Sequence, residues 1–232
     1  MKLSSLLSPA PKPAPPPPAP TPEQRERAEQ WLARPMAELV RAWITAINGY
    51  PERWQGRLRL RATDEQVDDL ARRLGCRPPR ALREFYASCN GVSSMSGEFP
   101  HLLLPAQALV RGHEHRPPLS QQCRRRLAAS PDPEGETATA LRVEPAPLLP
   151  TAALARDELS ADDIDRLLAL EIPRFGCGVT MNVDADEGFA RGVVFELDGT
   201  RAICHDSLAH WLATQTALLG RAAPAAISAP AA

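Results

Sequence analysis

The sequence lacks an excess of charge of either sign. Among its 232 residues, lysine and arginine number 27 and aspartate and glutamate number 28, so the formal net charge is −1. A chain with so little net charge is not built around bulk attraction to nucleic acid or to an anionic lipid surface. It also lacks any run of about 18 apolar residues, the length that a membrane-spanning helix requires. We therefore expect neither a membrane span nor direct nucleic-acid binding.

Cysteine is scarce and scattered along the chain. The five cysteines are Cys76, Cys89, Cys123, Cys177 and Cys204, and no two of them stand in a CxxC spacing. An odd number without paired spacing argues against a disulfide framework and against a structural zinc site. Two of the five, Cys89 and Cys204, lie within apolar patterns, and we predict them to be small core residues.

Proline, in contrast, is abundant, and nine of the 25 prolines fall between Pro9 and Pro22. Such a stretch buries little and donates few backbone hydrogen bonds, so we predict that residues 1–21 form an extended, disordered tail. The apolar run Leu3–Leu7 is interrupted by serine and is shorter than the core of a signal peptide, which favours a cytoplasmic protein. Residues 220–232 are rich in alanine and proline and are predicted to be frayed.

Residues 22–219 are predicted to form a single α+β domain. Capping boxes, in which a Thr or Ser side chain caps the helix that it precedes, indicate helices that begin after Thr21, Thr63 and Ser160. Apolar residues at helical spacing predict three more helices, and Asn-Gly pairs predict where two of them end. These further helices are expected at Met36–Asn48, at Pro79–Cys89 and from Asp206 or Ser207 to Leu219.

The strands are predicted mainly in the second half of the domain. Apolar segments at Gly178–Val183, Gly192–Leu197 and Ala202–Cys204 are typical of strands, and Asp198-Gly199 predicts a hairpin turn between the last two. Further strands are expected at His101–Val110, as one or two short pieces around a proline, and near residues 141–149. Residues 111–140 are polar without a sustained period, which predicts a long loop or a partly disordered insertion. Helices at both ends of a strand-rich middle indicate an α+β fold with a mainly antiparallel central sheet flanked by helices.

Three blocks of the sequence, in order, resemble the SUKH superfamily, which includes a fungal cell-wall-synthesis regulator and many bacterial immunity proteins. The first block, Leu74–Val92, has the family's helix ending in Leu-Gly, proline-led turn and second helix ending in Asn-Gly. The second block, Glu171–Asp184, is similar to the family's Ile-Pro strand, glycine turn and following strand. The third, Gly192–Leu219, is similar to its closing hairpin and C-terminal helix. The first block matches the family at Leu74, Gly75, Pro79, Leu82, Phe85, Asn90 and Gly91.

The resemblance implies a binding fold without catalysis, which neutralises a partner by covering it. None of the matching residues is a nucleophile, a base or a metal ligand, and their types suit helix ends and turns. We therefore expect a bacterial immunity protein that binds and blocks a cognate protein toxin, with no catalytic residue and no cofactor. The alternative is a scaffold or regulatory protein of the same fold that docks partners through its proline-rich tail.

Two groups of residues carry types that could support chemistry. His101, His113, His115 and Cys123 are suitable metal donors, but an HxH on a proline-flanked loop lacks the rigid spacing of a helical zinc motif, so a solvated loop is the preferred interpretation. Cys204-His205-Asp206 contains a nucleophile, a base and a carboxylate. Adjacent residues on a strand point to opposite faces, so we expect Cys204 to point inward, His205 outward, and Asp206 to cap the following helix.

The basic residues form two local groups. Arg57, Arg59 and Arg61 alternate with leucines, and Arg124-Arg125-Arg126 are consecutive. Nucleic-acid binding would call for aromatic residues among them, and Trp54 is the only one near the first group. We interpret the alternating arginines as a charged strand edge that resists aggregation.

The acidic residues are concentrated toward the C-terminus. Residues 1–150 carry 21 basic and 16 acidic residues, whereas residues 151–232 carry 6 basic and 12 acidic ones. Asp184, Asp186 and Glu187 are predicted to crowd one loop, where they would meet a basic toxin surface. The alternatives are an ordinary solvated loop and a calcium site, although the spacing is not that of an EF-hand.

Overall fold

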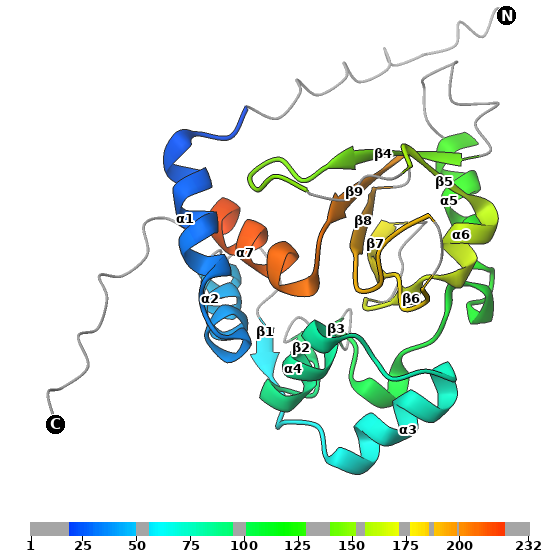
Figure 1. Ribbon diagram of the computed structural model, residues 1–232, viewed down its shortest axis with the longest axis horizontal. Coiled ribbons are helices and arrows are strands. Elements are labelled where there is room, and N and C mark those ends of the chain that lie inside the picture. The colour runs from blue at the N-terminus through cyan, green and yellow to red at the C-terminus, as the bar shows by residue number, and fades with distance from the viewer. Residues whose placement is uncertain are drawn as a thin grey trace, which may run out of the picture.

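The α+β class and the mainly antiparallel sheet are both confirmed by the structure. It is a computed structural model that describes residues 19–49, 56–94, 101–128, 140–151, 156–171, 177–185, 188–198 and 200–220. Of the two predicted tails, only residues 19–21 and 220 fall within these ranges. The described residues form helices around a six-stranded sheet, with a three-stranded sheet below it in the view of Figure 1.

Six of the seven helices in the described ranges, all but α5, begin at or next to the predicted position. The seven are α1 (Pro22–Leu32), α2 (Met36–Asn48), α3 (Asp64–Leu74), α4 (Arg80–Ser88), α5 (Leu119–Ala128), α6 (Ala161–Arg166) and α7 (Leu208–Leu219), with 3₁₀ helices η1 (Ala106–Ala108) and η2 (Gly112–Glu114). The capping boxes at Thr21, Thr63 and Ser160 are all present, and each side chain accepts a hydrogen bond from the backbone N–H three residues on. Ser207 caps α7 in the same way.

The strands form two separate sheets. They are β1 (Gly56–Leu58), β2 (Val92–Ser94), β3 (His101–Leu103), β4 (Ala140–Pro145), β5 (Glu158–Ser160), β6 (Leu168–Ala169), β7 (Cys177–Met181), β8 (Val194–Asp198) and β9 (Arg201–His205). The small sheet has the order β1-β2-β3, and the large sheet has the order β5-β4-β9-β8-β7-β6. The β4–β9 pair is parallel, and the other pairs of the large sheet are antiparallel.

The large sheet is buried on both faces. On one face, Phe195 and Cys204 pack with Leu119 of α5 and Ile164 of α6. On the other, the strands pack against α7, and α1 and α2 lie on the far side of that helix (Figure 1). Because α7 has neighbours on several sides, it is apolar around most of its circumference rather than along one stripe.

The expectation of a long loop at residues 111–140 is wrong. Residues 111–140 are not one long loop, because η2 and α5 lie within them; residues 129–139 are outside the described part of the chain. The buried apolar side chains of α5 include its own Leu119 and Cys123, and so short an apolar stripe does not show a helical period in the sequence. Of the one or two strands expected at His101–Val110, the structure has one, β3, which ends before Pro105 and is followed by η1.

Candidate functional site

The Asn-Gly pair that closes the first block has an architectural role. The Asn90 side chain is almost fully buried; its oxygen accepts a hydrogen bond from the backbone of Ala106 at 2.8 Å, and its amide nitrogen donates to Gln66 and Gln107. Gly91 has φ +82°, a left-handed conformation that favours glycine. Asn90 therefore joins α3, η1 and the end of α4.

Asn48-Gly49 ends α2 as predicted, but by a different geometry. Gly49 has φ −70°, which is right-handed backbone open to any residue. The Asn48 side chain instead accepts a hydrogen bond from the N–H of Gly56 and donates one to its carbonyl oxygen, at 2.7 and 3.0 Å. This pair of bonds fixes the start of β1.

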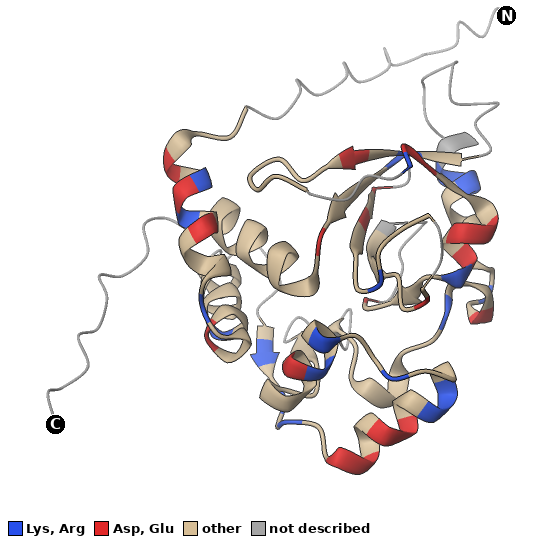
Figure 2. Cartoon of the chain, in the orientation of Figure 1, with Lys and Arg blue, Asp and Glu red and all other residues tan. Residues whose placement is uncertain are grey.

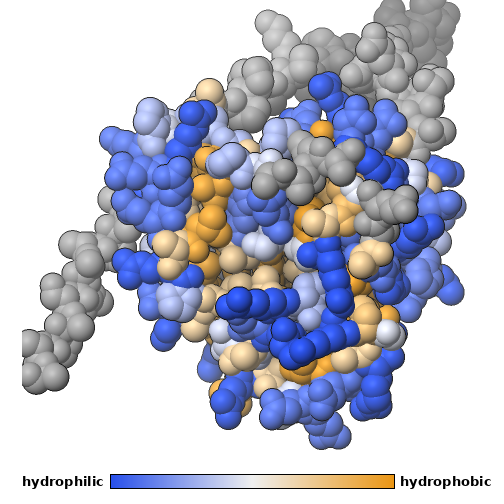
Figure 3. Space-filling view, viewed as in Figure 1, coloured by the Kyte–Doolittle hydropathy of each residue, from blue (hydrophilic) through white to orange (hydrophobic). Residues whose placement is uncertain are grey.

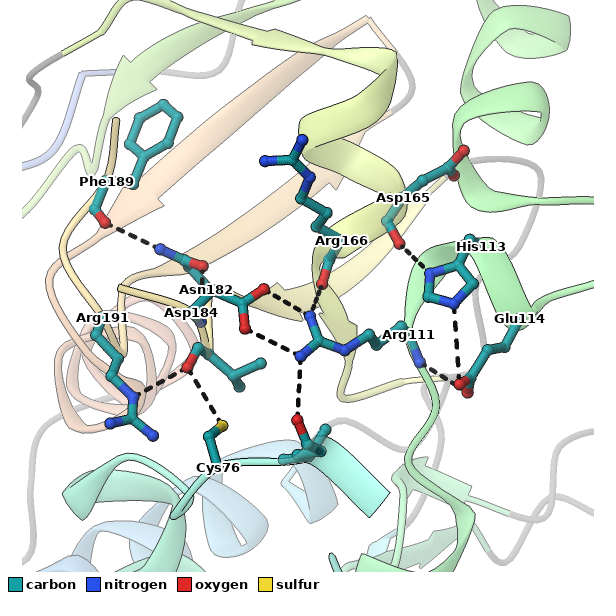
Figure 4. A network of polar contacts seen from close by, with 12 residues as sticks. Cys76, Arg111, His113, Glu114, Asp165, Arg166, Asn182, Asp184, Phe189 and Arg191 are labelled. Carbon is teal, nitrogen blue, oxygen red and sulfur yellow. Dashed lines mark hydrogen bonds and ion pairs between the residues drawn. The ribbon is translucent and has the colours of Figure 1, made fainter. Parts of the chain in front are cut away.

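A bidentate ion pair lies where the first two blocks meet. Arg111, just before η2, donates from Nη1 and Nη2 to the two carboxylate oxygens of Asp184, at 2.6 and 2.9 Å (Figure 4). The same guanidinium donates to the carbonyl oxygens of Arg166 at 3.1 Å and Leu74 at 3.4 Å. One side chain thus links the ends of α3 and α6 to the loop after β7.

Contacts to the backbone of Val183 extend this network toward the α3–α4 turn. Its carbonyl oxygen accepts from Nε of Arg191 at 2.9 Å and lies 3.7 Å from Sγ of Cys76 (Figure 4). A second guanidinium nitrogen of Arg191 donates to the carbonyl oxygen of Arg77. The segment between β7 and β8 is therefore held against the turn that joins α3 to α4.

Asp184, one of the three acids predicted to form a partner-binding patch, is already paired. The hydrogen bonds from Arg111 lower the pKa of its carboxyl, and the charges of Arg166 and Arg191 act in the same direction. The carboxylate is consequently ionised at neutral pH, but its charge is offset by its neighbours. The other two acids, Asp186 and Glu187, lie outside the described residues, so the three-acid patch stays a prediction.

Cys204 and His205 point to opposite faces of the sheet, as predicted, but the expectation that His205 faces solvent is wrong. Both side chains are fully buried. Burial raises the pKa of the Cys204 thiol to about 12, so it stays neutral. Since α7 covers the second face of the sheet, His205 is enclosed, with its ring 5.4 Å from that of His210 in an edge-to-face arrangement. The helix is capped by Ser207 and not by Asp206.

This buried histidine pair was missed by sequence reasoning. Nδ1 of His210 accepts a hydrogen bond from the backbone of Asp206 at 3.1 Å, and burial lowers the pKa of His210 to about 4. The ring nitrogens of His205 have no hydrogen-bond partner in the described structure, although Glu196 lies 3.9 Å from Nε2. The sequence did contain one signal for this pair. His205 ends a strand and His210 lies in the first turn of the next helix, and the short connection through the cap residue Ser207 keeps the two close together.

The other candidate groups are dispersed. His113 is exposed and lies 3.1 Å from the carbonyl oxygen of Asp165, whereas Cys123 is buried under the sheet; the side chain of His101 is not described. Within the described ranges, no three His, Cys, Asp or Glu side chains form a group that could hold a metal. Arg57 lies on β1 at the edge of the small sheet, and Arg59 and Arg61 follow that strand. The consecutive arginines Arg124–Arg126 are exposed on α5.

Comparison of the chain with models of protein families, with curated proteins and with solved structures finds no match. The resemblance to the SUKH superfamily therefore stays a prediction. None of the helices in the described ranges is both long enough and apolar enough to cross a membrane.

Proposed function

We propose that this chain is an immunity protein that binds a cognate bacterial toxin and blocks it by covering part of its surface. In this proposal the chain acts in the bacterial cytoplasm, without a cofactor and without catalysis. The observation that carries it is the packing of the three SUKH-like blocks. Apolar residues from all three blocks meet in one core cluster, which includes Phe85 and Tyr86 from the first block, Met181 from the second, and Val194 and Trp211 from the third.

The residues that distinguish the first block have structural tasks, as a non-catalytic binding protein requires. Gly75 ends α3 with φ +67°, Pro79 precedes the first residue of α4, and Asn90 joins three elements. Burial raises the pKa of the Cys89 thiol to about 12, so this cysteine, like Cys204, is not a ready nucleophile. These properties favour recognition by shape and charge over group transfer.

Growth rescue tests the proposal directly. The candidate toxin is the product of the reading frame next to this chain's gene, which is expressed in a bacterial host together with the full chain or with a control carrying an early stop codon. We expect growth with the full chain and arrest with the control. Arrest in both cultures, with the chain present in soluble form, would reject the immunity function.

Deleting residues 2–18 separates immunity from docking through the proline-rich tail. The deletion stops before Thr21 because its side chain caps α1, and removing it would disturb the fold. We expect the shortened chain to rescue growth as well as the full chain does. Loss of rescue by a shortened chain with an unchanged melting temperature would instead favour the scaffold that docks by its tail.

A further inference from the structure

We propose that the chain's contact face is an arginine surface at the α3–α4 turn, and that it takes an acidic patch on a protein partner. We define the arginine surface as Arg77, Arg80, Arg83 and Arg191. The inference rests on the proposed function for the partner's identity, and it adds the location and the chemistry of the contact. It also differs from the sequence-based expectation, which placed an acidic loop against a basic toxin.

The surface is assembled from segments far apart in the sequence. Arg77 lies in the turn, Arg80 is the first residue of α4, and Arg83 donates from Nε to the carbonyl oxygen of Pro78 at 3.2 Å. Arg191 arrives from the segment before β8 and donates to the carbonyl oxygen of Arg77. Gly192 lies against the same turn, because a Cβ at that position would be 3.4 Å from Cβ of Pro79.

Two guanidinium groups on this surface, those of Arg77 and Arg80, are available to a partner. The Arg80 side chain is 85% exposed, and its one carboxylate partner among the described residues, Glu84 at 2.7 Å, lies one turn further along α4 and is 46% exposed. Such an exposed pair contributes little and exchanges readily with another carboxylate. Arg77 is exposed, and its side chain has no hydrogen-bond or ion-pair partner among the residues described. Figure 2 shows basic positions at the end of α3, in the turn and at the start of α4.

The described carboxylates nearby do not cancel this positive charge. Among the described residues, Glu84 is the one acid that forms an ion pair with an arginine of this surface. Asp184 forms its ion pair with Arg111, which lies outside the surface. Strongly hydrophilic side chains lie across this part of the molecule, next to apolar patches, in Figure 3. Arginine next to apolar area is the composition found at protein–protein contacts.

The residue type favours a protein partner over a nucleic acid. Lysine occurs in the chain only at positions 2 and 12, so every basic residue of the described domain is arginine. Arginine is enriched at protein interfaces, where lysine is depleted, and its planar fork binds a carboxylate through two parallel hydrogen bonds. The net charge of −1 for the whole chain does not provide the broad positive field on which nucleic-acid binding depends.

Calorimetry with charge-reversed variants of the full chain tests this surface. The probe is the candidate toxin, the product of the adjacent reading frame, in a form inactivated by substitution so that it can be purified. The test variant is Arg77→Glu/Arg80→Glu, and the matched control is Arg124→Glu/Arg125→Glu, which makes the same charge change at exposed positions of α5. A third variant, Asp186→Lys/Glu187→Lys, reverses the acidic loop.

We expect the test variant to bind about 100-fold more weakly than wild type, and the α5 control to stay within about threefold. The melting temperature of each variant should stay close to that of wild type, since the substituted arginines have no buried contacts. Wild-type affinity should also fall as salt is added.

Each of the remaining outcomes overturns the arginine surface. Equal affinities for all variants, or equal losses in the test variant and the α5 control, would show that this surface makes no specific contact. Weakening by the Asp186→Lys/Glu187→Lys variant alone would assign the contact to the acidic loop. Binding of a single-stranded RNA oligonucleotide that the test variant loses would indicate a nucleic-acid site. Absence of binding by wild type would reject the proposed function together with this surface.

Discussion

At the scale of single residues, two glycines of the first block differ in how much space surrounds them. Gly75 and Gly91 both adopt left-handed backbone, with φ +67° and +82°. A Cβ at Gly75 would meet nothing within 4 Å, whereas one at Gly91 would lie 2.7 Å from the carbonyl oxygen of Leu103. The first glycine is needed for its backbone conformation alone, and the second also for close packing against another backbone segment.

Alanine substitution should separate these two roles. Gly75→Ala should lower the free energy of unfolding by about 1 kcal/mol, the cost of a left-handed non-glycine residue. Gly91→Ala should lower it by about 3 kcal/mol or more, because the backbone near Leu103 must also move. Urea unfolding measures both values, and equal losses would contradict the close packing at Gly91.

The buried His210 provides a second prediction at this scale. Its pKa falls from 6.5 to about 4 on burial, so between these values the unfolded chain binds a proton that the folded chain excludes. Stability is therefore lost as the pH falls through this window, and the free energy of unfolding should be about 2 kcal/mol lower at pH 5 than at pH 7. Urea unfolding at the two pH values measures the difference.

Replacement of this histidine provides the control. A His210→Asn variant should be less stable than wild type at pH 7, but it should lose less stability on acidification. A His210→Asn variant that loses as much as wild type between pH 7 and pH 5 would show that His210 is not the group that titrates.

At the scale of elements, the Arg111–Asp184 pair joins α3, α6 and the loop after β7. The two side chains are 18% and 35% exposed, and their contact has two hydrogen bonds. Bidentate, partly buried ion pairs are worth more than exposed ones, because water competes less for the donors. The exposed pair of Arg80 and Glu84 within α4 offers a matched comparison.

A double-mutant cycle measures this difference. Arg111→Met, Asp184→Asn and the double variant should give a coupling free energy of about 1 to 2 kcal/mol. The corresponding cycle with Arg80→Met and Glu84→Gln should give a coupling close to zero. Equal coupling in the two cycles would contradict the linking role of Arg111.

Elements whose signals are local could be predicted from the sequence, and those that depend on distant packing could not. Thr21, Thr63 and Ser160 cap helices through residues only three positions away, so their patterns are complete in the sequence. The helix α5 has a short apolar stripe, and only the sheet above it explains its burial. The enclosure of His205 likewise depends on α7 covering a strand face, which alternation along β9 does not reveal.

At the scale of the whole molecule, the candidate contact face is also a product of distant segments. Arg77 and Arg191 are 114 positions apart, and their proximity follows from the folding of the β7–β8 segment onto the α3–α4 turn. Sequence reasoning identified the groups Arg57–Arg61 and Arg124–Arg126 because their members are neighbours in the chain. It also counted Asp184 as a free acid, because its partner Arg111 is 73 positions away.

The central claim is that the chain blocks its partner by remaining bound to it. Titrating the purified chain into a fixed amount of the active toxin domain, with residual toxin activity as the readout, tests this claim most directly. We predict a linear loss of activity that is complete at one chain per toxin. Toxin activity that persists at a molar excess of the chain would contradict this claim. Complete loss of activity with the chain at about one hundredth of the toxin concentration would also contradict it, because one bound chain could not then account for each blocked toxin.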